Sequence, residues 1–200
     1  PFTATETPLI FCAVESVTNL FNHTEKAVLN PIYRDKLNIF RKQYVGTGEF
    51  VRNAKISTGN DFLEELRYVQ YGNTLPLNDS LDEEGGTLNL TIDMETGTGK
   101  TYVYLKTILD LHFKYNKAFN KFIIVVPSVP IRLGVEKSIE VFKEKFEEDY
   151  DGIDIAKHTI IYDADMKNSV KTIRDNFINK NGLTILVINT QAFNRINNKL

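Results

Sequence analysis

The sequence contains a single cysteine, Cys12, among its 200 residues. One cysteine excludes an internal disulfide and any zinc site built from several thiolates, which fits a reducing cytoplasm. No apolar run approaches the roughly 18 residues needed to cross a membrane, and the first residues lack the basic region and apolar stretch of a signal peptide. The sequence therefore predicts a soluble, cytoplasmic protein with no membrane partner, and we expect Cys12 to be a buried structural thiol.

The chain also lacks an excess of basic charge. It has 24 Lys and Arg against 26 Asp and Glu, which gives a formal net charge of −2 and a pI near 6.0. A globally basic nucleic-acid binder is not indicated, so any contact with DNA must come from a local patch. The three histidines have no metal-ligand spacing, and no Ser-His-Asp or Cys-His arrangement is found. The hydrophobic content of 42% supports one core-bearing domain with an appendage, or two small domains.

What the chain does contain is a glycine-rich segment at residues 91–101, TIDMETGTGKT. The apolar run at 88–92 predicts a strand before it, and the pattern over 100–115 predicts a helix after it. On such a turn, Gly97 and Gly99 allow backbone angles that direct successive N–H groups into one concavity around an anion. The N-terminus of the helix adds its partial positive charge. This arrangement is typical of a phosphate-binding loop.

The residues of the loop predict nucleotide binding with ATP and Mg²⁺ as cofactors. We expect Lys100 to reach the β- and γ-phosphates and the Thr101 hydroxyl to bind the Mg²⁺ that bridges them, so these two are the candidate catalytic residues. The segment departs from the full G-x-x-x-x-G-K-[ST] pattern, because Met94 stands where the first glycine belongs. The predicted cofactor-binding residues are Thr96, Gly97, Thr98, Gly99, Lys100 and Thr101.

Strand and helix patterns alternate after the loop. Residues 122–126 and 184–188 are continuous β-rich apolar runs, as expected for buried parallel strands, and 159–162 is a shorter strand candidate. Helical patterns cover residues 130–146 and 170–177. The alternation predicts an α/β fold with a doubly wound, mostly parallel sheet flanked by helices, whose ligand lies at the carboxyl ends of the strands.

The N-terminal part is predicted to be mainly helical. Apolar spacing indicates a helix over 9–21 and a weaker one over 32–44, and Asn60 is a candidate cap for a helix over 61–71. Residues 72–86 are predicted to be a polar connector. We therefore expect two parts: an N-terminal helical region with its connector, residues 1–87, and an ATP-binding domain, residues 88–200.

Two later segments follow buried strands and therefore share one edge of the predicted sheet. They are residues 127–132, PSVPIR, and residues 189–193, NTQAF. Their hydroxyls, their helix-start amides and Arg132 are suited to holding a nucleic-acid backbone. Ordinary helix capping by Ser128 and Asn189 explains the same residues without a ligand.

Three segments together, METGTGKTYVYLKTI, KFIIVVPSVPIRLGVEKSI and VINTQAFN, resemble the Res subunit of type III restriction–modification enzymes, which are superfamily two helicase-like ATPases. The similarity covers residues 88–194, and the methionine that departs from the generic loop is usual in that family. The resemblance implies a RecA-like first motor domain that binds MgATP, acts on double-stranded DNA and works with a DNA-methyltransferase (Mod) subunit. It also implies DNA contacts by Ser128, Arg132 and Thr190.

Two departures from the family pattern shape this expectation. Such ATPases often place a glutamine ahead of the first helix to read adenine, and we place Ile10 at that position. No acidic D-E-x-H box follows the loop before Leu200, so we expect an N-terminal fragment of an ATP-dependent type III site-specific deoxyribonuclease subunit, inactive alone. The alternatives are another helicase-like DNA motor such as a type I restriction subunit or repair helicase, a P-loop small-molecule phosphotransferase, and a non-catalytic nucleotide-binding module.

Overall fold

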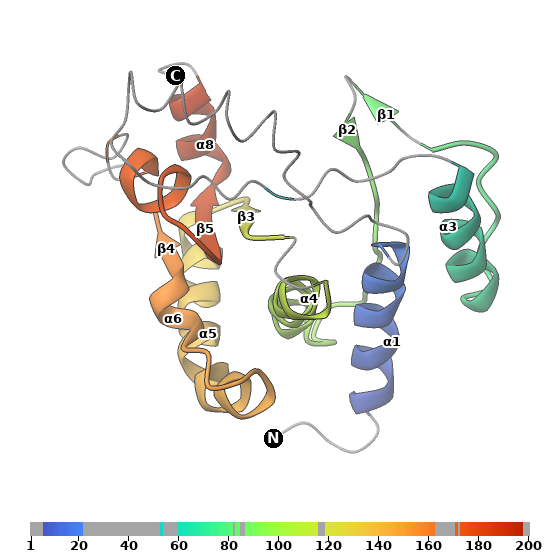
Figure 1. Cartoon of the computed structure of the whole chain (residues 1–200), viewed down its shortest axis with the longest axis horizontal. Coiled ribbons are helices and arrows are strands. Elements are labelled where there is room, and N and C mark those ends of the chain that lie inside the picture. Colours follow the sequence, from blue (N-terminus) through green and yellow to red (C-terminus); the bar gives the residue numbers. More distant parts are fainter. Residues whose placement is uncertain are drawn as a thin grey trace, which may run out of the picture. The chain divides into compact units, whose positions relative to one another are not determined.

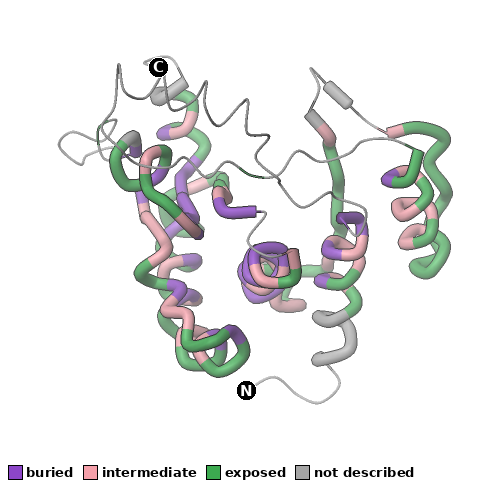
Figure 2. Tube along the Cα trace, viewed as in Figure 1, coloured by how far each residue is buried: buried purple, intermediate pink, exposed green. Residues whose placement is uncertain are grey.

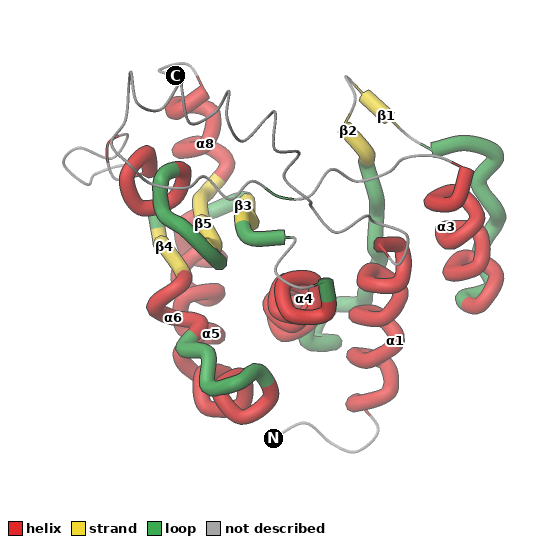
Figure 3. Tube along the Cα trace, viewed as in Figure 1, coloured by secondary structure: helices red, strands yellow, loops and turns green. Residues whose placement is uncertain are grey.

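The computed structural model describes residues 6–21, 53, 60–81, 83–84, 87–115, 119–162, 171 and 173–197. The order of its helices and strands along the chain can be followed in Figure 1 and Figure 3. The chain divides into two compact units, one formed by Pro1–Lys26 with Ala54–Leu111 and the other by Ala27–Asn53 with His112–Leu200. This division does not coincide with the boundary that the sequence predicts between residues 87 and 88.

The first unit begins with two helices that the sequence predicts. Helix α1 (Glu6–Thr18) continues into a short 3₁₀ turn, η1 (Asn19–Phe21), and α3 (Asn60–Gly72) follows later in the chain. The buried rings of Phe21 and Phe62 pack edge to face, with their centroids 5.8 Å apart. Ile10 lies inside α1 rather than ahead of it, and the helix predicted over residues 32–44 lies outside the described residues.

The prediction that Cys12 is buried is wrong. Its side chain is exposed. Val14 and Thr18, which are four residues apart and therefore on one face of α1, are 1% and 3% exposed. Cys12 lies two positions before Val14, away from that stripe, and so its thiol points away from the packed side of the helix.

The strand predicted over residues 88–92 is also largely absent. Within the connector, β1 (Glu83–Glu84) pairs antiparallel with β2 (Thr87–Leu88). Residues 89–95 have no regular secondary structure, and Leu90 and Ile92 are 38% and 52% exposed. The apolar run therefore contributes only its first residue to a strand, and that strand belongs to a two-stranded ribbon.

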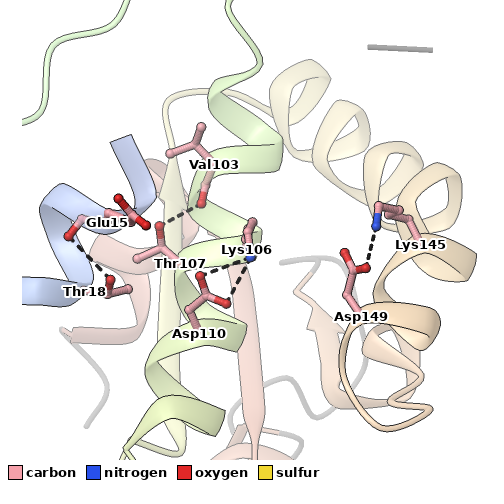
Figure 4. Close-up of polar contacts among 8 residues, drawn as sticks. All are labelled: Glu15, Thr18, Val103, Lys106, Thr107, Asp110, Lys145 and Asp149. Carbon is pink, nitrogen blue, oxygen red and sulfur yellow. Dashed lines mark hydrogen bonds and ion pairs between the residues drawn. The ribbon is translucent and has the colours of Figure 1, made fainter. Parts of the chain in front are cut away.

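Helix α4 (Lys100–Lys114) confirms the helix predicted after the loop. Its buried side chains include Leu105 and Leu109, both at 0% exposure. Bonds within the helix hold its polar residues: the Thr107 hydroxyl donates to the Val103 carbonyl at 2.8 Å, as Figure 4 shows. The same view shows Lys106 paired with Asp110, with its Nζ 3.1 Å from Oδ1. Such four-residue spacing stabilises exposed or half-buried helix faces.

The second unit is organised on three parallel strands in the order β3–β5–β4, which confirms an α/β fold with a small parallel sheet. Val126 at the end of β3 pairs with Asn189 at the end of β5, and Thr159 in β4 pairs with Ile185. All three strands were predicted within a residue or two of their observed bounds. They are β3 (Lys121–Val126), β4 (Thr159–Ile161) and β5 (Thr184–Asn189).

Burial differs between the central and the flanking strands. Every residue of β5 is buried (Figure 2), and Ile185, Val187 and Ile188 are 0% exposed. Strand β3, which the sequence predicts to be buried on both faces, leaves Ile123 and Val125 48% and 47% exposed. In the described sheet β3 is an edge strand, and these alternate residues lie on the face away from its packed side.

Helices pack on this sheet and complete its core. Both α5 and α8 contact β3 and β5. The helix predicted over residues 170–177 is described in part: Lys171 and Ile173 are α-helical, and Arg174–Ile178 form a π-helical turn. The unit's core includes Tyr162, Phe177, Leu186 and Ile188. The helical elements are α5 (Val129–Asp149), α6 (Ile155–His158), η2 (Arg174–Ile178) and α8 (Thr190–Asn197).

The amino end of β3 is fixed by the side chain of Asn53, which is distant in sequence, and by the side chain of Lys121, the first residue of the strand. The Asn53 carboxamide accepts from the backbone N–H groups of Asn120 and Lys121 at 2.7 and 2.8 Å, and donates to the Lys121 carbonyl at 2.8 Å. The Lys121 ammonium donates to the carbonyls of Lys180 and Gly182 and to the Thr184 hydroxyl. Burial, and then repulsion by Lys180, lowers the pKa of Lys121 to about 8.

Among the described residues, no helix has both the length and the apolar character to span a bilayer.

Candidate functional site

The candidate phosphate loop, residues 93–99, connects the irregular run before it to α4. Gly97 and Gly99 have φ angles of +84° and +86°, in the left-handed region that favours glycine. A Cβ on Gly97 would meet nothing within 4 Å, so the requirement for glycine there is conformational rather than steric. The prediction that both glycines adopt backbone angles unfavourable for other residues is confirmed.

The carbonyl oxygen of Glu95 is the centre of the hydrogen bonds in this loop. It accepts from the Thr98 hydroxyl at 2.7 Å and from the Lys100 ammonium at 2.6 Å. The second bond is charge-assisted and is therefore the stronger of the two. Sequence reasoning considered the side chains and the backbone N–H groups of the loop but missed this carbonyl oxygen, since no residue pattern shows where a carbonyl points.

The loop leads directly into α4. Lys100 is the first residue of that helix, and the Gly99 carbonyl accepts its first backbone bond, from Val103 at 3.0 Å. The Thr101 hydroxyl follows at the second position, where the backbone N–H groups have no partner within the helix. One turn later, burial raises the pKa of Tyr104, and a hydrogen bond with Thr101 partly offsets that rise. The roles of this segment toward ATP and Mg²⁺ stay predictions.

The residues proposed to face DNA lie at the carboxyl edge of the parallel sheet, as predicted. Ser128 stands at the N-cap of α5 with φ −148° and ψ 162°, and within the described part of the chain its side chain makes no capping bond. Thr190 begins α8 and is exposed, and its hydroxyl donates to the Val126 carbonyl at 3.2 Å. Asn189 is 8% exposed at the end of β5. Capping therefore does not account for the Ser128 hydroxyl.

Arg132 occupies a different environment from the other two. It is 5% exposed, and its guanidinium donates to the Tyr162 carbonyl, just after β4. This contact ties α5 to a segment 30 positions later in the chain, a pairing that no local pattern indicates. A DNA contact by Arg132 stays a prediction, and it requires the guanidinium to leave this buried position.

A family model described as "Type III restriction enzyme, res subunit" matches residues 53–200 of the chain. The matched range contains the phosphate loop and all three parallel strands. It begins at Asn53, the residue whose carboxamide holds the start of β3.

Three curated proteins are similar over parts of the chain. The type III restriction-modification enzyme EcoPI Res subunit of Escherichia phage P1 is 38% identical over 114 residues, 50% of this chain and 11% of that protein. The EcoP15I Res subunit of Escherichia coli is 49% identical over 65 residues, 30% of this chain and 6% of that protein. The StyLTI Res subunit of Salmonella typhimurium is 38% identical over 91 residues, 44% of this chain and 9% of that protein. The matched part thus spans 11% or less of each relative.

Proposed function

This chain belongs to the type III restriction enzyme Res subunit family, and we propose that it is the ATP-binding first motor domain of such a subunit, with a RecA-like fold. The observation that carries the proposal is the geometry of the phosphate loop. Two glycines with left-handed angles precede a lysine and a threonine that open α4. These are the residue types and the conformation that close on a polyphosphate.

In this proposal each residue of the loop has a task toward the nucleotide. The N–H groups of Thr96 to Gly99 bind phosphate oxygens, and the Lys100 ammonium neutralises charge on the β- and γ-phosphates. The Thr101 hydroxyl would hold Mg²⁺, and that ion would supply positive charge that offsets the negative charge developing on the phosphate oxygens during phosphoryl transfer. Catalysis of this kind depends on positioning and electrostatics, which is why the placement of Lys100 and Thr101 at the start of α4 matters.

The carboxyl edge of the sheet is the proposed DNA-contacting surface. The hydroxyls of Ser128 and Thr190 and the amides at the starts of α5 and α8 are suited to phosphate oxygens, which carry no sequence information. A net charge of −2 gives no general attraction to DNA, so we expect weak backbone binding. Cleavage of double-stranded DNA and assembly with a Mod methyltransferase are proposed for the whole enzyme.

Substitution of the loop lysine tests nucleotide binding. Lys100→Ala removes a charge-assisted contact worth about 2–3 kcal/mol, so MgATP affinity measured by calorimetry should fall at least about tenfold. Lys137→Ala, an exposed lysine on α5, is the matched control and should bind as the parent does. Equal affinities of the parent and a folded Lys100→Ala chain would contradict the proposal.

Titration with a labelled DNA duplex separates the motor from its main alternative. Backbone binding should weaken steeply as salt is raised, because bound phosphates release counterions. A small-molecule phosphotransferase should bind MgATP without any response to DNA. Tight, sequence-selective binding at physiological salt would contradict the proposed backbone contacts.

A further inference from the structure

Lys100 has one hydrogen-bond partner within the loop and a second, the nucleotide, in the proposed function. Its ammonium donates to the Glu95 carbonyl at 2.6 Å, whereas nucleotide binding, as proposed above, requires the same ammonium at the phosphates. The Glu95 carbonyl therefore competes with the nucleotide for Lys100. When Lys100 moves from the Glu95 carbonyl to a phosphate, that carbonyl loses a hydrogen-bond donor. The free-energy cost of this lost bond is smaller when a second donor already binds the same oxygen.

Thr98 supplies that second donor. Its hydroxyl lies 2.7 Å from the same Glu95 oxygen and spans the turn at residues 96–97, in which Gly97 takes its left-handed angle. We propose that Thr98 is a positioning residue that keeps the Glu95 carbonyl, and with it the shape of the loop, fixed while Lys100 transfers from that carbonyl to the nucleotide phosphates. This inference rests on the proposed function and adds to it a residue that acts through Lys100.

The Thr98 side chain binds the Glu95 carbonyl and not the phosphates. Its backbone N–H is available to the nucleotide, but its hydroxyl proton is committed to Glu95. Removal of the hydroxyl leaves Lys100 as the only one of these two side chains on the Glu95 oxygen. Departure of Lys100 from the Glu95 carbonyl then becomes less favourable, so a smaller fraction of the molecules has the loop in its binding-competent form. The apparent affinity for the nucleotide falls in proportion to that fraction.

Thr98→Val tests the inference because it keeps the shape of the side chain and removes its donor. In the full 200-residue chain, titration with a fluorescent ATP analogue and Mg²⁺ should show affinity about three- to tenfold weaker, the value of one ordinary hydrogen bond. Thr98→Ser restores the donor and should bind within about twofold of the parent. The matched control is Thr91→Val, an exposed threonine outside the loop, which should leave affinity unchanged.

A double-mutant cycle separates action through Lys100 from direct contact with the nucleotide. In a Lys100→Ala chain there is no ammonium to exchange, so adding Thr98→Val should change affinity by less than about twofold. Equal losses in both backgrounds would overturn the inference and assign Thr98 a direct contact, and an unaltered affinity in the single variant would overturn it as well. Failure of the parent to bind MgATP would instead refute the proposed function, on which the inference depends.

Discussion

Two apolar runs of similar length, each followed by a helix, end up in opposite environments. Residues 184–188 form β5, the central strand, in which Ile188 is 0% exposed. Residues 88–92 remain irregular after Leu88, and Ile92 is 52% exposed. After Thr184 the first run is continuously apolar, whereas the second alternates Leu88, Leu90 and Ile92 with polar residues. A continuously apolar strand can be buried on both faces. An alternating strand has one apolar face, and whether it is buried depends on which neighbouring element covers that face.

The runs also differ in how their ends are held. The start of β5 is fixed by Lys121, whose ammonium donates to the Thr184 hydroxyl at 3.0 Å, and its end is tied through Thr190 to Val126. The run at 88–92 leads instead into a loop whose hydrogen bonds are internal, centred on the Glu95 carbonyl. Strand β5 is therefore buried and held at both ends, whereas the loop after residues 88–92 is held by its own hydrogen bonds, and there we propose that Lys100 changes partners.

The largest expected effect is on the free energy of unfolding, and it tests burial in the two runs directly. Ile188→Ala leaves a cavity in the sheet and should lower the free energy of unfolding by about 2–5 kcal/mol. Ile92→Ala removes a half-exposed side chain and should cost less than about 0.5 kcal/mol. Urea denaturation followed by circular dichroism measures both, with Ile131→Ala, 48% exposed on α5, as a control for losing an exposed isoleucine. A cost for Ile92→Ala equal to that for Ile188→Ala would show that the 88–92 run is buried.

A second pair of substitutions compares a glycine of the candidate phosphate loop with a glycine of α5, the helix that packs on β5. Gly97→Ala places a residue with a Cβ in the left-handed backbone conformation, which costs about 1–2 kcal/mol. Because the loop is exposed, we expect this strain to appear as an MgATP affinity about tenfold weaker. Gly134→Ala adds a Cβ with nothing within 4 Å, inside α5, and should raise the free energy of unfolding by about 0.5–1 kcal/mol. Calorimetric titration and urea denaturation measure the two. A Gly97→Ala chain with parental affinity would show that the left-handed angle is not needed for binding.

The smallest expected effect concerns the anchor of β5. The pKa of Lys121 is lowered to about 8, below the value of about 10.4 expected in an unfolded chain. Between these values the unfolded state holds the additional proton, so the Lys121 contribution to the free energy of unfolding should rise with pH from about 8 to about 10.4. Urea denaturation across this range should show a smaller rise in Lys121→Met than in the parent. Identical slopes would contradict the lowered pKa.

Much of the fold and part of the site are encoded locally. The helices at α1, α3, α4 and α5 follow from apolar spacing, and the strands at β3 and β5 from short β-rich runs. The left-handed angles of Gly97 and Gly99 follow from their place between an apolar run and a helix. The π-helical form of η2 and the exposure of Cys12 do not follow, because apolar spacing alone tells neither the hydrogen-bond pattern of a turn nor which weakly amphipathic face packs.

By itself, the sequence determined the alternation of strands and helices, the position of the candidate phosphate loop and the residue types it presents, since each depends on neighbours within one or two turns. Only the tertiary structure decided that Arg132 is buried against the Tyr162 carbonyl and that Asn53 holds the start of β3. It also decided that β5, and not the run at 88–92, is enclosed by other strands. A hydrogen bond or a strand pairing stabilises by only about 1 kcal/mol per contact, so the choice among distant partners depends on the packing of the whole unit rather than on any short stretch of chain.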